Sequence, residues 1–332
     1  RNKLAKLEGA EDALVFSSGC GAIAAALFSQ LRHGDHLVCI RKPYNWVAHF
    51  CRIILPKYGI QTTFVEEGSA RAYEAACQPN TKLFYLESPN TFTFEITDIR
   101  AVAEIAKSKG IVTVIDNSYS TPLYQSPLSL GIDLVLHSAS KYLAGHSDVI
   151  AGVLAGSKEM IGKIYNSEYL AFGAVLPPFE AWLMLRGLRT LEIRLQRSSS
   201  NAKALIEAIE NHPRIKRILY PFHSQHPKNE IARSQMKDCS GLFSIELEAD
   251  TPDEVILFCN SLKHFLKAVS WGGFESLVDP AITVYNFDHP ELNELSWRTV
   301  RFYCGLESPE ILIDDVLQAL NILDNGATNR QK

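Results

Sequence analysis

A lysine preceded by two serines is the first feature of this chain that could do chemistry. Ser138, Ser140 and Lys141 follow the apolar run 132–136 in the stretch HSASKYLAGHSD. Two hydroxyls beside a lysine suit a phosphate group, and a partly desolvated lysine beside an anion suits a covalent bond to an aldehyde. A single lysine in a turn would otherwise be interpreted as a surface residue, so its role depends on its neighbours.

An aspartate ends the nearly apolar run IVTVIDNS (111–118). The carboxylate of this residue, Asp116, would be costly to bury unless it were paired. Two interpretations are open from the residues alone. Asp116 could cap the following turn, or it could pair with a cationic ring nitrogen such as that of pyridoxal phosphate (PLP).

The stretch SSGCGA (17–22) is a candidate phosphate-binding turn. Small residues let backbone N–H groups approach a phosphate, and the following helix adds its positive end. Gly19, Gly21 and Ala24 also fit a loose dinucleotide pattern. That pattern requires an acidic residue about 20 positions later, at the end of the second strand. Asp35 instead starts the run 35–40, which disfavours a nicotinamide cofactor and oxidoreductase chemistry.

The strands predicted to position these clusters alternate with helical segments. Apolar runs lie at 13–18, 35–40, 61–66, 81–88, 111–118 and 132–140, and the segment 98–110 has an amphipathic helical pattern. Alternation of this kind predicts βα units and a mostly parallel sheet. Ligands bind at the carboxyl ends of such strands. Together the clusters suit PLP, with phosphate at the glycine turn, the ring nitrogen at Asp116 and the aldehyde at Lys141.

The second half of the chain has a different pattern of predicted helices and strands. A long helical stretch (188–212) precedes strand-like runs at 215–220 and 241–249 and a helical run at 253–265. We therefore expect a PLP-binding large domain over 1–187 and a smaller α+β domain over 188–332. The chain starts inside a helical pattern without a methionine, and we expect a preceding segment to be missing.

Composition excludes several classes of partner. A formal net charge of −4 gives no electrostatic reason to expect nucleic acid or an anionic membrane. No apolar run reaches the roughly 18 residues that a membrane helix needs. Seven widely spaced cysteines without a CxxC indicate free thiols in a reducing, cytoplasmic compartment. His223 and His226 lie in a polar loop without further ligands, so no metal site is expected.

Motifs along the whole chain resemble those of the Cys/Met-metabolism (trans-sulfuration) enzymes. These enzymes are fold-type I, aminotransferase-like and PLP-dependent. In order, the motifs are KLAKLEGAEDALVFSSGCGAIAAAL, LRHGDHLV, LESP, IDNSYSTP, SASKYLAGHSD, RGLRTLEIRL, SGLFSIEL, SWGGFESL and VRFYCGLES. The ordered series is far more specific than any single motif.

The resemblance assigns a role to each matching position. Lys141 matches the lysine that bonds to the cofactor aldehyde and transfers protons, and Asp116 matches the partner of the ring nitrogen. The other cofactor positions are Tyr44 (ring stacking and a catalytic role), Gly19 and Cys20 (backbone phosphate contacts), and Ser138 and Ser140 (phosphate hydroxyls). The substrate positions are Arg301, which clamps the α-carboxylate, with Ser270 and Trp271.

Several positions depart from the family pattern or carry no predicted chemistry. Thr91 stands where the family has asparagine, and Tyr303 where a small residue or histidine is usual. His146 and Asp148 are interpreted as structural support beyond the lysine. The family also implies a homotetramer built from dimers with shared sites. Its neighbouring-subunit phosphate ligands come from an arm that would precede Arg1.

Within the family, the motif VSWGGFESL resembles the corresponding motif of bacterial cystathionine β-lyases. Val269 stands where γ-lyases of cystathionine carry glutamate, and Trp46 where methionine γ-lyases carry cysteine. The resemblance therefore implies β-elimination of L-cystathionine to homocysteine, pyruvate and ammonia. The alternatives are cystathionine γ-synthase, cystathionine or methionine γ-lyase, and O-acetylhomoserine sulfhydrylase.

Overall fold

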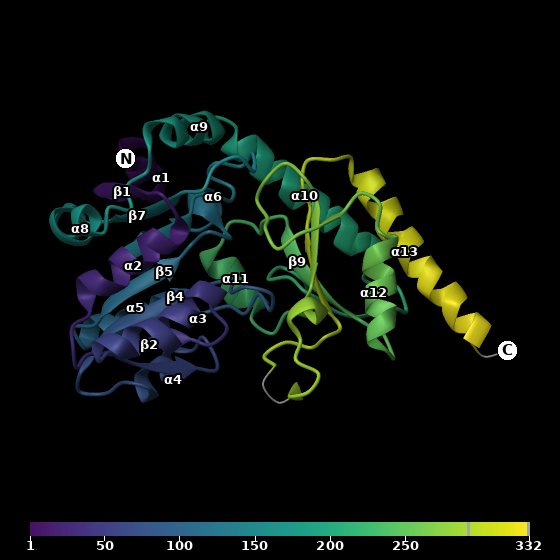
Figure 1. The fold of residues 1–332 in the computed structure, drawn as a ribbon, viewed down its shortest axis with the longest axis horizontal. Helices are drawn as coiled ribbons and strands as arrows, with labels where there is room; N and C mark the ends of the chain where they lie inside the picture. Colours follow the sequence, from purple (N-terminus) through teal and green to yellow (C-terminus); the bar gives the residue numbers. More distant parts are fainter. Residues whose placement is uncertain (291–292, 331–332) are drawn as a thin grey trace.

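A computed structural model describes residues 1–290 and 293–330, with side chains described as far as residue 324. Two β-sheets with flanking helices are joined by the long helix α10 (Leu191–Ile209), as Figure 1 shows. The first sheet has seven strands in the order β1-β7-β6-β5-β4-β2-β3. Its strands are β1 (Asp12–Phe16), β2 (His36–Ile40), β3 (Gln61–Val65), β4 (Thr81–Glu87), β5 (Val112–Asp116), β6 (Leu134–Ser138) and β7 (Gly152–Gly156).

Only β7 breaks the parallel arrangement of this sheet, since it is antiparallel to both β1 and β6. The pairs of β2 with β3 and β4, of β4 with β5, and of β5 with β6 are parallel. The predicted mostly parallel sheet is therefore confirmed. Each predicted strand is present, trimmed by one to four residues, whereas β7 has a sequence too rich in glycine to show a strand pattern. Gly152 is required there, because a Cβ would lie 2.2 Å from the Ser18 carbonyl oxygen.

Helices cover both faces of the first sheet. They are α1 (Asn2–Glu8), α2 (Gly19–Gln30), α3 (Asn45–His49), α4 (Ala70–Ala75), α5 (Ile99–Ser108), α6 (Thr121–Tyr124), α7 (Lys158–Ile164), α8 (Leu170–Phe172) and α9 (Pro178–Leu188). Alternate strand residues enter separate cores, since Val114 packs on the α2 side and Ile115 on the α5 side. Helix α5 begins at its cap Asp98 and buries the expected apolar stripe. The α2 helix begins at Gly19, beside the end of β6.

The second sheet has five strands in the order β10-β11-β12-β9-β8. They are β8 (Ile215–Leu219), β9 (Leu242–Leu247), β10 (Leu266–Lys267), β11 (Leu277–Pro280) and β12 (Thr299–Tyr303), with helices α11 (Asn229–Gln235), α12 (Pro252–Ser261) and α13 (Pro309–Arg330). Ring contacts of Phe302 with Phe243, Phe258 and Phe265 fill its core. This confirms a smaller α+β part, and the expected boundary near residue 187 falls inside α9.

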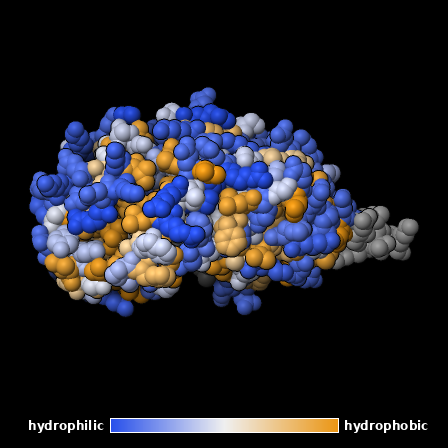
Figure 2. All heavy atoms as spheres, turned by 90° about the horizontal axis from the view of Figure 1, so that it is seen from above, coloured by the Kyte–Doolittle hydropathy of each residue, from blue (hydrophilic) through white to orange (hydrophobic). Residues whose placement is uncertain are grey.

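The surface is mainly hydrophilic, with apolar side chains gathered in several exposed groups (Figure 2). Within residues 1–290 and 293–330, no helix is both long and apolar enough to cross a membrane.

Candidate active site

The predicted nucleophile, Lys141, lies just beyond β6 and faces a loop from the second sheet. Its Nζ donates to Ser270 Oγ at 2.8 Å and lies 5.3 Å from the centre of the Trp271 ring. The next residue of that loop, Gly272, has φ +87°, and a Cβ on it would lie 2.9 Å from the Lys141 Cα. Only glycine lets this loop pack so closely against the lysine. The structure thus brings three predicted site residues together across 129 positions of sequence.

The electrostatic surroundings prepare Lys141 for proton transfer. Burial and, to a lesser extent, the positive charge of Arg301 lower its pKa, the negative charge of Asp116 opposes them, and the net result is a pKa of about 8. An amine with this pKa has an appreciable neutral fraction near pH 7–8, as a nucleophile or general base needs. Asp116 and Arg301 therefore both lie close enough to Lys141 for their charges to shift its pKa, in opposite directions.

The predicted ring-nitrogen partner, Asp116, is the last residue of β5 and is only 8% exposed. Its Oδ1 accepts a hydrogen bond from the Ser118 backbone N–H at 2.9 Å. Burial raises the pKa of Asp116, while the contacts with Ser118 and the charges of His137 and Lys141 oppose that rise. The turn-capping contact exists, and it coexists with a buried carboxylate that a cationic ring would stabilise.

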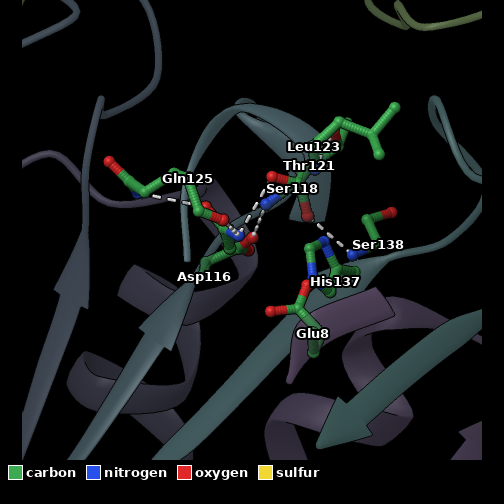
Figure 3. A network of polar contacts seen from close by, with 9 residues as sticks. Glu8, Asp116, Ser118, Thr121, Leu123, Gln125, His137 and Ser138 are labelled. Carbon is green, nitrogen blue, oxygen red and sulfur yellow. Dashed lines mark hydrogen bonds and ion pairs between the residues drawn. The ribbon is translucent and has the colours of Figure 1, made fainter. Parts of the chain in front are cut away.

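Ser118 links this aspartate to the segment before the lysine. The N–H of Ser138 donates to Ser118 Oγ at 2.6 Å, so one serine contacts both strand ends (Figure 3). Below them, Glu8 from α1 pairs through Oε1 with Nε2 of His137. Both side chains are almost fully buried. Sequence reasoning missed this pair, because 129 positions separate its members and neither lies in a ligand pattern.

The phosphate side of the site is formed by the start of α2. Ser18 caps the helix, because its Oγ accepts from the Gly21 N–H at 3.0 Å. Among the described residues, the N–H groups of Gly19 and Cys20 have no protein acceptor. A Cβ on Gly19 would lie 3.2 Å from Ser138 Cβ, so the serine borders these free donors. Two free N–H groups at the N-terminus of a 12-residue helix fit a phosphate.

The second predicted phosphate hydroxyl has backbone partners. Ser140 Oγ donates to the Ala151 carbonyl at 3.2 Å and accepts from the Ala151 N–H at 2.9 Å. These bonds hold the turn that carries Lys141 against the start of β7. A phosphate contact by Ser140 stays a prediction, since its hydroxyl hydrogen already has an acceptor.

A buried glutamate at the end of β4, Glu87, supports the Tyr44 segment. Its Oε2 accepts from the Tyr44 N–H at 2.7 Å, and its Oε1 accepts from the N–H and the hydroxyl of Thr91, each at 2.8 Å. Burial and the neighbouring charge of Asp116 raise the pKa of Glu87, the hydrogen bonds from Tyr44 and Thr91 oppose the rise, and the net result is a pKa of about 8. Glu87 lies within the motif LESP, but no role was predicted for it. Thr91 therefore holds Glu87 at the position where the family has asparagine.

The predicted ring-stacking residue, Tyr44, is 38% exposed at the edge of the site. Burial raises the pKa of its phenol to about 12, and negative charge at Cys20, Asp116 and Glu87 contributes. Tyr44 therefore lies near both the α2 N-terminus and Asp116. At neutral pH its phenol keeps its proton and can donate it.

The predicted carboxylate clamp, Arg301, lies in β12 and is only 4% exposed. Its Nη2 donates to Asp279 Oδ2 at 2.8 Å and to the Val269 carbonyl at 2.7 Å. The guanidinium carbon lies 4.4 Å from the centre of the Phe92 ring. No role was predicted from the sequence for Asp279 or Phe92. Asp279 lies in the neighbouring strand β11, and Phe92 lies in the loop between β4 and α5.

The remaining sequence candidates have local partners. The Tyr303 hydroxyl donates to the Gly273 carbonyl at 2.7 Å and so anchors the loop that carries Ser270. His146 Nδ1 lies 2.8 Å from the Ala144 carbonyl oxygen. His223 pairs with Glu210 at 3.1 Å. Within the described part of the chain, no group of three or more His, Cys, Asp or Glu side chains could hold a metal ion.

Comparison with known proteins gives one family for the chain. The profile of the family described as Cys/Met metabolism PLP-dependent enzyme matches residues 1–321. Cystathionine beta-lyase MetC of Bacillus subtilis (strain 168) is 38% identical over 321 residues, 96% of this chain and 82% of the relative. Cystathionine gamma-lyase of the same strain is 35% identical over 319 residues, 95% of this chain and 83% of the relative. The crystal structure of metB from Corynebacterium glutamicum has a TM-score of 0.91 at 34% identity, covering 96% of this chain and 83% of that one.

Proposed function

Because the chain belongs to the Cys/Met metabolism PLP-dependent enzymes, we propose that it cleaves the Cβ–S bond of L-cystathionine. The products are homocysteine, pyruvate and ammonia, in the transsulfuration chemistry of methionine biosynthesis. PLP is the family's cofactor, which replaces the nicotinamide alternative raised by the glycines of the α2 turn. The observation that carries the proposal is the position of the Lys141 amine, which donates to Ser270 Oγ at 2.8 Å in a site where the charges of Arg301 and Asp116 also act on it.

The residues present fit the cofactor. When bound, PLP supplies an electrophilic aldehyde and a ring that stabilises negative charge developing at the substrate Cα. Lys141 would bond to the aldehyde and Asp116 would face the ring nitrogen. The free N–H groups of Gly19 and Cys20, with Ser138 beside them, would hold the phosphate.

The chain's own groups then have distinct tasks. Arg301 binds the substrate α-carboxylate, a task that suits a guanidinium. Lys141 removes the Cα proton, and the electron pair left behind forms the Cα–Cβ double bond as the Cβ–S bond breaks. The departing thiolate takes a proton from Lys141 or from Tyr44, whose pKa of about 12 keeps it protonated. Ser270, 2.8 Å from the Lys141 amine, orients that amine.

We propose β-elimination rather than γ-chemistry because of the aromatic side chains beside the lysine. The Trp271 ring packs against Tyr142, with 5.6 Å between ring centres, and lies over the Lys141 amine. A γ-enzyme must remove a second proton, at Cβ, with a base that can reach it. We infer that an indole in this position would restrict movement of the amine from Cα toward Cβ.

The second candidate function is γ-elimination or γ-replacement, in accord with the relative named cystathionine gamma-lyase at 35% identity. Product analysis with L-cystathionine separates the two, because β-lysis yields pyruvate and γ-lysis yields 2-oxobutyrate. Turnover of O-acetylhomoserine with sulfide, and neither keto acid from cystathionine, would exclude both lyase activities.

The site assignment has a test of its own. Borohydride reduction of the cofactor-loaded enzyme, followed by proteolysis and mass spectrometry, should place the label on Lys141. A label on any other lysine contradicts the assignment, whatever the substrate proves to be.

We also propose a cytoplasmic homotetramer, a dimer of dimers. Helix α9 supports self-association, since Phe179, Trp182 and Leu185 are 64%, 58% and 43% exposed. Three large apolar side chains on one helix are unusual on a surface that contacts only water. The mass of the full-length enzyme by light scattering tests this, and Trp182→Glu should reduce it.

A further inference from the structure

We propose that Asp279 is an internal counter-ion that the substrate α-carboxylate must replace on Arg301. Asp279 would then limit the affinity of the site for carboxylate ligands. This inference rests on the proposed function, because it takes Arg301 as the group that binds the substrate carboxylate.

The hydrogen bonds of Arg301 leave it without a free fork. Its Nη2 has two hydrogens, and the structure directs one to Asp279 Oδ2 at 2.8 Å and the other to the Val269 carbonyl at 2.7 Å. A guanidinium offers a carboxylate two forks, Nη1 with Nη2 and Nε with Nη2. Both forks need a hydrogen of Nη2. A carboxylate can therefore bind in the bidentate manner only after one of these two bonds is released.

The pair of Arg301 and Asp279 is built into the second sheet. Residue 279 of β11 lies directly opposite residue 301 of β12 in the antiparallel register. Arg301 and Asp279 are 4% and 8% exposed. The Phe92 ring covers the guanidinium at 4.4 Å. A contact fixed by strand pairing and covered by an aromatic ring is a standing feature of the resting site.

Of the two bonds to Nη2, the one to Asp279 is the one that a substrate carboxylate can replace. A buried guanidinium needs a negatively charged partner, and the carboxylate of Asp279 or that of the substrate can serve as this partner. The Val269 carbonyl is neutral and cannot serve as this partner. Two carboxylates on one guanidinium repel each other, so the bound substrate weakens the Arg301–Asp279 pair and that pair opposes substrate binding. The Arg301–Asp279 pair thus makes the site selective, because only a ligand with its own carboxylate can displace Asp279 and bind the guanidinium.

The test is Asp279→Asn in the cofactor-loaded enzyme. Asparagine keeps an oxygen that can accept from Nη2 but removes the charge that competes with the ligand. Dissociation constants are measured by calorimetry and by cofactor absorbance for L-alanine and for ethylamine, which differ by the carboxylate. We expect L-alanine to bind roughly three- to tenfold more tightly, with the affinity for ethylamine unchanged. Weaker or unchanged binding of L-alanine would show that Asp279 only positions Arg301, and would overturn the proposal.

Two further variants separate the causes. Glu275→Gln, four residues earlier, removes a carboxylate that accepts from the Ser147 hydroxyl and should leave both affinities as in the wild type. If it also tightens L-alanine, the effect is general charge and the proposal fails. If Asp279→Asn does not fold, Asp279→Ser, which is also neutral, has the same expected result.

Arg301→Gln distinguishes failure of this inference from failure of the proposed function. It should remove the preference for L-alanine over ethylamine. If the preference survives, Arg301 is not the carboxylate ligand and the proposed function fails at that residue. If the preference is lost but Asp279→Asn gives no gain, only the counter-ion role is wrong.

Discussion

The two halves of the site are built in different ways. The cofactor half, with Asp116, Lys141 and the glycine turn at the start of α2, comes from the carboxyl ends of β5, β6 and β1 in one mostly parallel sheet. The substrate half, with Ser270, Arg301 and Asp279, comes from a loop and two antiparallel strands of the second sheet. In the first half, the geometry of a parallel sheet brings the residues to one edge. In the second, tertiary contacts between distant segments bring them together.

The halves also differ in charge, and Lys141 lies where they meet. The cofactor half holds the two buried carboxyl groups of Asp116 and Glu87, and burial raises the pKa of both. Arg301 supplies the positive charge of the substrate half. The positive charge of Arg301 lowers the pKa of Lys141 and the negative charge of Asp116 raises it. The pKa of this one amine therefore depends on both halves. Removing the charge of Arg301 should raise this pKa, and removing the charge of Asp116 should lower it.

Lys141→Ala should have the largest effect, because it removes the amine that donates to Ser270 and on which the charges of both Asp116 and Arg301 act. We expect turnover of L-cystathionine to fall by about 10³-fold or more, since the base and the covalent attachment of the cofactor are lost together. Steady-state kinetics measures this, and circular dichroism should show an intact fold. The matched control is Lys158→Ala, an exposed lysine at the start of α7, which should keep wild-type activity. Activity of Lys141→Ala near that of the wild type would refute the assignment.

Asp116→Asn should have the next largest effect, confined to the cofactor half. Asparagine can still accept from the Ser118 N–H, but it cannot stabilise a cationic ring. We expect turnover to fall by about 10²-fold, within the range for loss of one electrostatic contact to the reacting system. Binding of L-alanine should change little, because Arg301 is untouched. A loss of less than about threefold would mean that Asp116 only caps its turn.

The sequence predicts the structure of the cofactor half better than that of the substrate half. The strands of the first sheet and the α5 stripe were predicted because period and turn residues are local signals. Lys141, Asp116 and Gly19 could be brought to one edge by sheet topology alone. β7 was missed because a glycine-rich run carries no strand pattern.

The unpredicted residues depend on contacts that no local signal encodes. Asp279 contacts Arg301 across two strands that are adjacent only in the folded sheet. Phe92 lies in a loop and has φ +64°, a backbone conformation that residues with bulky side chains rarely adopt, and its ring contacts Arg301. Glu87 was visible in a motif, but its partners Tyr44 and Thr91 appear only once the loops are placed. Resemblance to a family supplied Arg301, and the structure supplied what surrounds it.

The charge coupling between the halves predicts a pH effect on cofactor loading. Reaction of the cofactor-free protein with PLP needs the neutral amine of Lys141, so its rate should rise with pH and level off above about 8. Arg301→Gln removes a charge that lowers this pKa, and the midpoint should therefore move to higher pH. Stopped-flow absorbance between pH 6 and 10 would show loading a few-fold slower at pH 7.5. A midpoint unchanged in Arg301→Gln would mean that the halves are electrostatically independent.

The smallest effect should come from Glu87→Gln, which tests the acidic side of the comparison through stability. Glu87 has a pKa of about 8 in the folded protein against an ordinary value of 4.5. Between these pH values the folded protein binds a proton that the unfolded chain has released, so the contribution of Glu87 to stability is full below pH 4.5 and is lost as pH rises through about 8. Glutamine does not titrate, so the variant should gain a few °C of melting temperature relative to the wild type between pH 5 and pH 8. Calorimetry on the cofactor-free proteins measures this, and a pH-independent difference would show that Glu87 is ionised throughout and that the cofactor half holds two buried charges.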